Sequence, residues 1–173
     1  ADTRRFTIAG SDQAVAVLGF RLMQSWADRA GPNVQLAFVA SEHSSSLERF
    51  ERGEIDLLIG SERGVPAWAK ARKLYDERFV FVQRKRHPRG ATAPDLDAYC
   101  ALDHVLVSTS GGSFFGFMDE HLEAMGRARR VALSVQHFTA VPDLVALSDY
   151  VATLPSRLVT RYRDKLDVFD LPF

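Results

Sequence analysis

The first sixty residues alternate short apolar runs with helical patterns, and this alternation restricts the fold more than any other feature of the sequence. Apolar runs at 5–10, 34–40 and 55–60 predict strands, and the segments 11–29 and 46–52 have the polar starts and apolar periodicity of helices. The third run, IDLLIG, has the apolar character of a buried strand in a parallel sheet. Because strand–helix–strand units have right-handed crossovers, these residues are predicted to form a doubly wound α/β layer.

The second half of the chain repeats the alternation after a single extended strand at 79–83. A segment that leaves one α/β unit and enters another in this way is a hinge candidate, so we expect two subdomains, residues 1–77 and residues 78–173. The expected elements of the second subdomain are helices at 94–100, 114–126 and 139–147, strands at 104–109, 130–135 and 150–154, and a helix that starts at Ser156. The spacing in helix 114–126 predicts that it buries Phe114, Phe117, Met118, His121 and Met125.

The helix expected at 11–29 has two adjacent apolar stripes. One consists of Val15, Leu18, Leu22 and Trp26, and the other of Ala16, Phe20, Met23 and Ala27. Two stripes are wider than packing on one sheet requires. The helix is therefore either deeply buried within this chain, or it packs one stripe on the sheet and the other on another subunit.

The composition excludes several classes of protein. Hydrophobic residues make up 46% of the chain, which is enough for a core, and the formal net charge is zero, without the basic stripe of a DNA-binding module. The single cysteine, Cys100, excludes an internal disulfide and a cysteine zinc site, and indicates a reducing compartment, the cytoplasm. We see no apolar run of membrane-spanning length and no signal peptide, and we expect no membrane partner.

Small polar residues follow the predicted strands at the point where each strand ends. Ser11, Ser41 and Ser61 follow the first three strands, and the segment 109–112 follows a later one. In open α/β sheets, ligands bind at the carboxyl ends of the strands, where helix N-termini offer N–H groups and hydroxyls. We therefore expect these residues to face one ligand-binding cleft. The alternative is that they are ordinary helix caps.

The segment 135–158, VQHFTAVPDLVALSDYVATLPSRL, carries a more specific likeness, and so does ERGEIDLLIG at 51–60. Together they resemble the effector-binding domain of LysR-type transcriptional regulators, above all regulators of nodulation and of aromatic-compound breakdown. Where that family often has a glycine before its strand, this chain has Tyr150.

The resemblance implies an α/β fold with two Rossmann-like subdomains joined by crossover strands, like the type 2 periplasmic binding proteins. We expect this chain to lack the N-terminal winged helix-turn-helix and linker helix of such regulators. We also expect the returning crossover strand and final helices to be absent, which would leave subdomain 1–77 incomplete.

The resemblance also implies a set of effector-binding residues. Ser11 and Ser41 correspond to positions that contact the effector's carboxylate or another polar group. The segment from Ser110 to Phe114 corresponds to the loop on the other side of the cleft, and Phe138 and Thr139 to a helix start that faces it. The phenylalanines at 114, 115, 117 and 138 suit an aromatic effector, although Phe117 has the spacing of a core residue.

We therefore expect an effector sensor that acts as a homodimer or tetramer through the Ser11–Arg29 helix and contacts DNA only through the absent helix-turn-helix. We expect no cofactor, no metal and no enzyme activity, because metal-ligand spacings and the common catalytic motifs are missing. The alternatives are a solute-binding protein of a transporter and an enzyme that uses the same cleft.

Overall fold

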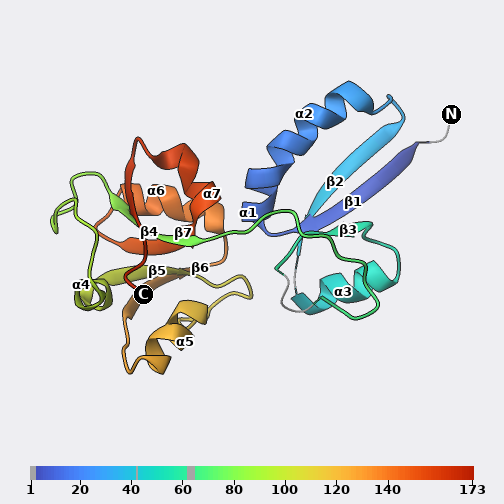
Figure 1. The fold of residues 1–173 in the computed structure, drawn as a ribbon. Coiled ribbons are helices and arrows are strands. Elements are labelled where there is room, and N and C mark those ends of the chain that lie inside the picture. The colour runs from blue at the N-terminus through green and yellow to red at the C-terminus, as the bar shows by residue number, and fades with distance from the viewer. Residues whose placement is uncertain (1–2, 42, 62–64) are drawn as a thin grey trace. The chain divides into compact units, whose positions relative to one another are not determined.

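The computed structural model describes residues 3–41, 43–61 and 65–173, and the chain divides into two compact units, 1–76 and 77–173. We call these the N-terminal unit and the C-terminal unit. The sequence predicted this boundary one residue later, after residue 77. Each unit has its own β-sheet (Figure 1).

The N-terminal unit contains a parallel sheet in the order β2-β1-β3. Its strands are β1 (Arg4–Gly10), β2 (Val34–Ala40) and β3 (Leu57–Leu58). After β1 the chain forms a helix of three consecutive segments, and after β2 it forms one further helix. They are α1 (Asp12–Ala14), a π-helical segment (Val15–Gly19), α2 (Phe20–Arg29) and α3 (His43–Glu51). The predicted parallel α/β layer is confirmed.

The two apolar stripes of the helix after β1 have different environments. The first stripe is partly buried, and its Trp26 ring contacts Phe6 of β1 edge to face, with 6.2 Å between ring centroids. On the second stripe, Phe20 is 63% exposed and Met23 is 51% exposed. The interpretation that this helix is deeply buried within the chain is therefore wrong, because only one of its two apolar stripes is covered.

The prediction of a buried strand at 55–60 is wrong in length and in burial. Only β3 forms a ladder, through the pairs Ile8 with Leu57 and Ala9 with Leu58. Leu57 is 57% exposed, whereas Ile55 is buried. The reason is that β3 lies at the edge of the sheet, where a strand has a neighbour on one side only.

The C-terminal unit contains a mixed sheet in the order β6-β5-β7-β4-β8. The strands are β4 (Phe79–Arg84), β5 (Asp103–Val107), β6 (Arg130–Val135), β7 (Val151–Pro155) and β8 (Leu166–Phe169). Strand β5 is parallel to β6 and β7, while β4 is antiparallel to β7 and β8. Because β5, β6 and β7 are parallel, the loops that follow them leave the same edge of the sheet.

Helices cover both faces of this sheet (Figure 1). Helices α4 (Leu96–Ala101) and α5 (Phe117–Ala124) cover one face, and α6 (Val141–Ala146) and α7 (Ser156–Val159) cover the other. A 3-10 turn, Phe138–Ala140, precedes α6, and another, Thr160–Tyr162, follows α7. Since side chains alternate along β4, Phe81 packs with the α4 and α5 core while Val80 and Val82 pack with the α6 and α7 core.

Helix α5 starts three residues later than the sequence predicted. Gly111 and Gly112 have φ angles of 82° and 75°, and Gly116 is the N-cap, so the segment before Phe117 is a loop. The later start also changes which residues are buried. Of the five expected to be buried, Met118 is 8% exposed, whereas Phe114, Phe117, His121 and Met125 are exposed.

Strand β8 was not predicted. It runs antiparallel to β4 from the pair Phe81 and Phe169 to the pair Arg84 and Leu166. Because β8 belongs to the sheet of the C-terminal unit, it is not a strand of subdomain 1–77, which the sequence predicted to be incomplete. The LDVF segment has only weak alternation, and its strand conformation depends on the free edge of β4.

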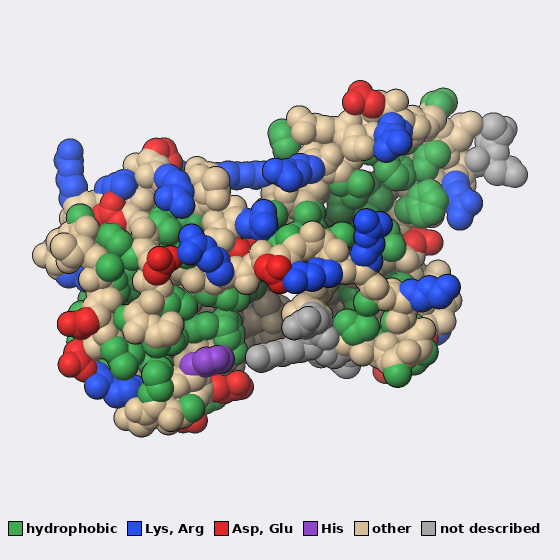
Figure 2. Space-filling view, in the orientation of Figure 1, with side chains coloured by type: hydrophobic (Ala, Val, Ile, Leu, Met, Phe, Trp, Pro, Cys, Tyr) green, Lys and Arg blue, Asp and Glu red, His purple; other side chains and the backbone are tan. Residues whose placement is uncertain are grey.

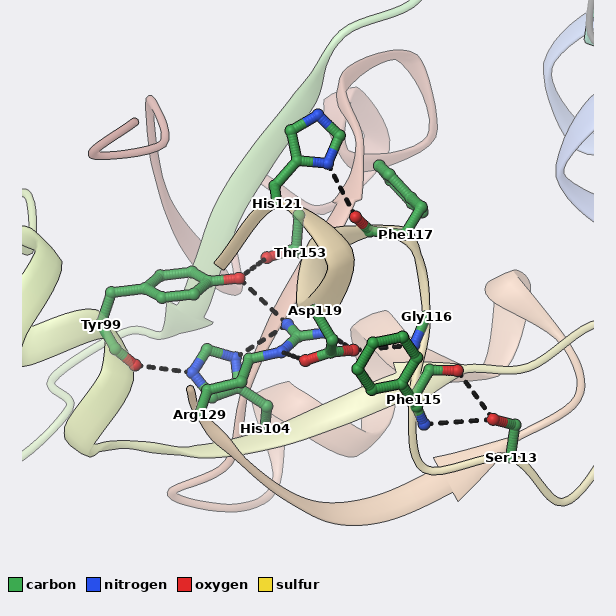
Figure 3. A network of polar contacts seen from close by, with 10 residues as sticks. All are labelled: Tyr99, His104, Ser113, Phe115, Gly116, Phe117, Asp119, His121, Arg129 and Thr153. Atoms are coloured by element: carbon green, nitrogen blue, oxygen red, sulfur yellow. Dashed lines mark hydrogen bonds and ion pairs between the residues drawn. The ribbon is translucent and has the colours of Figure 1, made fainter. Parts of the chain in front are cut away.

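A buried ion pair joins α5 to the segment before β6 (Figure 3). The Arg129 side chain is 2% exposed and the Asp119 side chain 10%. Arg129 Nε lies 2.7 Å from Asp119 Oδ1, and Nη2 lies 3.0 Å from Oδ2. Arg129 Nη1 also donates to the Tyr99 hydroxyl of α4 at 3.0 Å, so one guanidinium connects α4, α5 and the segment before β6.

His104 of β5 is fully buried beside this ion pair. Arg129 Nη1 lies 3.4 Å from Nδ1, and since a guanidinium can only donate, Nδ1 is the acceptor and Nε2–H donates to the Tyr99 carbonyl at 2.7 Å. Burial lowers the pKa of His104 from 6.5 to about 4. The native state therefore keeps this imidazole neutral at a pH where the unfolded chain binds a proton.

This difference predicts a pH dependence of stability. Above pH 6.5 both states are neutral and the folded state has its full stability, whereas between pH 6.5 and about 4 only the unfolded state is protonated, so stability falls as the pH falls. Between pH 7 and pH 4.5, the wild type should lose about 2 kcal/mol more unfolding free energy than the His104→Gln variant, which has no imidazole to protonate. Urea denaturation at the two pH values measures this difference. The matched control is the substitution of the exposed His137 by Gln. Equal pH profiles for wild type and H104Q would contradict the assignment.

Candidate functional site

In the N-terminal unit, the structure brings Ser11 and Ser41 to the same edge of the sheet. They directly follow the paired residues Gly10 of β1 and Ala40 of β2, and the Ser41 N–H donates to the Gly10 carbonyl at 3.1 Å. Both serines are partly buried. Their position at the carboxyl ends of parallel strands is the one at which α/β sheets bind ligands.

Ser11 is also a helix cap. Its Oγ accepts a hydrogen bond from the Ala14 N–H at 3.2 Å at the start of α1. The alternative that Ser11 is an ordinary helix cap is thus observed. A hydroxyl that accepts from the helix still has its own hydrogen to donate, so capping leaves Ser11 able to bind an acceptor on a ligand.

In the C-terminal unit, the loops after β5 and β6 leave the sheet together. Val107 pairs with Val135, and the Ser108 N–H donates to the Val135 carbonyl at 2.8 Å. A Cβ added to Gly111 would lie 3.9 Å from the Gln136 side chain, so the two loops lie close together. Ser110 is exposed in the first loop.

The rest of the predicted loop residues differ in exposure. Phe114 is 59% exposed and its neighbour Phe115 is 48% exposed. Phe138 and Thr139, at the start of the turn that precedes α6, are partly buried. The sequence therefore located this edge correctly but could not separate residues that point into the unit from those that point into solvent.

The Asp119 carboxylate fixes the loop that carries Phe114 and Phe115. Its Oδ2 accepts from the Gly116 N–H at 2.8 Å (Figure 3). Within the loop, Ser113 Oγ donates to the Phe115 carbonyl at 2.7 Å and accepts from its N–H at 3.1 Å. A Cβ on Gly116 would lie 3.0 Å from Leu106 of β5, so this close approach of the loop to the strand favours glycine.

A small cavity of about 30 Å³ lies within the C-terminal unit beside the loop after β5. It is lined by Phe79, Val105, Leu106, Val107, Phe117, Met118, Arg129, Phe138 and Thr153. The rings of Phe79 and Phe117 meet nearly edge to face, with 4.7 Å between centroids. Of the residues predicted to bind an effector, Phe138 is the one that lines this cavity.

Sequence reasoning did not identify Arg129, Tyr99 or Thr153 as a connected group. Arg129 donates to the Tyr99 hydroxyl, and that hydroxyl lies 2.7 Å from Thr153 Oγ1. Burial raises the pKa of Tyr99, so its hydroxyl keeps its hydrogen. The Tyr99 hydroxyl hydrogen has no acceptor other than Thr153 Oγ1 among the described residues, so we assign Tyr99 as the donor of this bond, which leaves the Thr153 hydroxyl hydrogen directed elsewhere. The spacing of these residues in the sequence gives no signal of this connection.

Two further features bear on partners and cofactors. In the ranges 3–41, 43–61 and 65–173, we find no group of three or more His, Cys, Asp or Glu side chains arranged to hold a metal ion. The helices in these ranges are too short or too polar to cross a membrane. On the face shown in Figure 2, basic side chains are interspersed with acidic ones, consistent with the zero net charge.

Comparisons with known proteins place this arrangement in a family. The model of the LysR substrate binding domain matches residues 2–173. The transcriptional activator NagR of a Ralstonia species is 32% identical over 162 residues, which are 93% of this chain and 53% of that protein. Nodulation protein D 3 of Mesorhizobium japonicum is 29% identical over 98% of this chain and 56% of its own length. The chain thus spans about half the length of these relatives.

A solved structure gives the same result. The crystal structure of a probable transcriptional regulator from Pseudomonas aeruginosa has a TM-score of 0.88 and 30% identity, and the match covers 98% of this chain and 57% of that one. The likeness to nodulation and aromatic-breakdown regulators that the sequence indicated is confirmed, as is the α/β fold with two subdomains. The chain belongs to the LysR substrate-binding domain family.

Proposed function

We propose that this chain senses a small organic effector and that, in a longer protein with a helix-turn-helix, it controls DNA binding and transcription. The observation that carries this proposal is the placement of Ser11 and Ser41. Both directly follow paired parallel strands, and the Ser41 N–H donates to the carbonyl of Gly10, the last residue of β1. Hydroxyls at the carboxyl ends of strands suit the polar group of a ligand.

We propose effector-binding residues in each unit. Ser11 and Ser41 of the N-terminal unit bind a carboxylate or another polar group, and Ser110, Phe114, Phe138 and Thr139 of the C-terminal unit bind an aromatic group. The exposed Phe114 ring and the partly buried Phe138 ring favour an aromatic effector. Such a ligand regulates the protein only through a difference in its affinity for two arrangements of the chain.

The other two functions considered from the sequence have less support. NagR is named as an HTH-type transcriptional activator, and the Pseudomonas aeruginosa structure is named as a probable transcriptional regulator. These names favour a regulator over a solute-binding protein or an enzyme. They also fit a cytoplasmic protein, which we propose here.

We further propose that the chain forms a homodimer or tetramer through the outward stripe of the Ser11–Arg29 helix. Phe20 and Met23 are exposed on this stripe, next to the partly buried stripe that packs on the sheet. Two large apolar side chains on one helix face are typical of a surface that another subunit covers.

The exposed edge of the N-terminal unit supports the proposal that subdomain 1–77 is completed by further chain. Leu57, Leu58 and Leu74 are between 36% and 61% exposed. An edge strand with exposed leucines is stabilised when another segment covers it. We propose that this segment belongs to the same longer protein.

The effector proposal predicts the behaviour of a double variant. A thermal-shift screen of aromatic acids, phenols, flavonoids, dicarboxylates and amino acids identifies the effector, because a ligand at 100 times its Kd stabilises the folded state by about 2.7 kcal/mol. Replacing Ser11 and Ser41 together by Ala should abolish this stabilisation. The control replaces Ser25, an exposed serine elsewhere on the same helix, by Ala. A full shift in the double variant would show that these serines do not bind the effector.

The subunit proposal predicts a change in mass. Met23→Glu places a charge in the outward stripe and should convert the assembly to monomers in sedimentation velocity, with an unchanged circular dichroism spectrum. The matched control is Gln24→Glu, which adds the same charge at the next, exposed position of the helix. An M23E variant that sediments with the mass of the wild-type assembly would exclude this stripe as the contact.

A further inference from the structure

The cavity of the C-terminal unit offers hydrogen-bond donors and no acidic side chain. Of its lining residues, Arg129 and Thr153 have polar side chains that form hydrogen bonds. A guanidinium has five N–H groups, and the contacts of Arg129 to Asp119, Tyr99 and His104 use four of them. Within the described part of the chain, the fifth N–H has no acceptor.

The second donor is the hydroxyl of Thr153. We assign its oxygen as the acceptor from Tyr99, because the single hydrogen of the Tyr99 hydroxyl has no other acceptor among the described residues. No other hydrogen bond of the Thr153 hydroxyl is found among the described residues, so its hydrogen is available. The hydrogen bonds from Arg129 through Tyr99 all run in one direction, which strengthens the last donor in the series.

The charge of Arg129 is already balanced. Asp119 accepts from it through both carboxylate oxygens, and His104 is neutral in its buried position. A carboxylate in this cavity would add a buried negative charge close to Asp119 without a free cation to pair with it, which is strongly unfavourable. The cavity therefore suits an uncharged acceptor, such as a carbonyl oxygen or a hydroxyl oxygen.

The size of the cavity determines which part of a ligand can enter. About 30 Å³ is room for one oxygen atom and not for an aromatic ring. Phe117, which lines the cavity, is 36% exposed, and Phe114 and Phe115 on the adjoining loop are more exposed still. An aromatic ring whose oxygen entered the cavity would therefore lie beside Phe117, which lines the cavity and is partly exposed.

We propose that this cavity is an oxygen subsite for an aromatic ligand, in which Thr153 and Arg129 donate hydrogen bonds to an uncharged carbonyl or hydroxyl oxygen. The inference rests on the proposed effector-sensing function and names the ligand chemistry that the C-terminal unit selects. It adds Thr153 as a ligand contact and Tyr99 as a residue that positions the Thr153 hydroxyl.

Isothermal titration with acetophenone, an aryl ketone, tests the proposal. The 173-residue chain should bind acetophenone, Thr153→Val should weaken binding by about fivefold to tenfold, and Thr153→Ser, which keeps the hydroxyl, should bind as the wild type does. Benzoate, which has the same ring with an anionic group, should show no dependence on Thr153. Thermal denaturation without ligand confirms that each variant is folded.

Two results would overturn the subsite. One is the absence of acetophenone binding to the wild type, and the other is equal binding to wild type and T153V. The proposed function is tested separately by the Ser11 and Ser41 double variant with the effector found in the screen. A lost effector response in that variant, together with equal acetophenone binding to T153V, would retain the sensor and reject the subsite.

Discussion

The pairing of Arg129 with Asp119 is the interaction on which most of the C-terminal unit depends. Removing one partner of a buried ion pair typically costs about 3–5 kcal/mol, because the other charge stays buried without compensation. Here the consequences extend further than the pair. Asp119 also holds the Gly116 N–H, and Arg129 also holds Tyr99 and His104. The exposed phenylalanine loop, helix α4 and the centre of the sheet are therefore all connected through one buried guanidinium.

The two units offer different chemistry to a ligand. In the N-terminal unit, serine hydroxyls and the first N–H groups of helices lie at the ends of parallel strands, an environment that favours a negative group. In the C-terminal unit, the donors next to the cavity are held by a charge that is already balanced, and the surroundings are aromatic. Each unit therefore selects a different chemical group. A molecule that lacks the group suited to a unit leaves the hydrogen-bond donors of that unit unpaired, which is a source of specificity.

Much of the fold could be predicted from the sequence, because short apolar runs between polar helix starts define strands in an α/β protein. The positions of Ser11 and Ser41 followed from the same pattern. The start of α5 could not be predicted, because it depends on the left-handed conformations of Gly111 and Gly112 and on the close approach of Gly116 to Leu106 of β5. Arg129 lies in the basic sequence RARR and is typical of an exposed residue, and only the three-dimensional arrangement brings Asp119 and Tyr99 to it. Strand β8 likewise exists because β4 has a free edge.

The π-helical segment Val15–Gly19 has a consequence for how this surface can change in evolution. A π-helical turn contains one residue more than an α-helical turn, and each residue of an α-helix advances the chain by about 100° around the axis. Loss of a single residue from this segment can be absorbed locally, because the π-helical turn then becomes an α-helical turn that rotates the chain through a similar angle. The side chains at Phe20 and Met23 would keep their present direction, whereas a deletion within α2 itself would rotate every later residue of the helix by about 100°. The π-helical segment is therefore a place where the helix can change in length by one codon while its outward stripe keeps the same orientation.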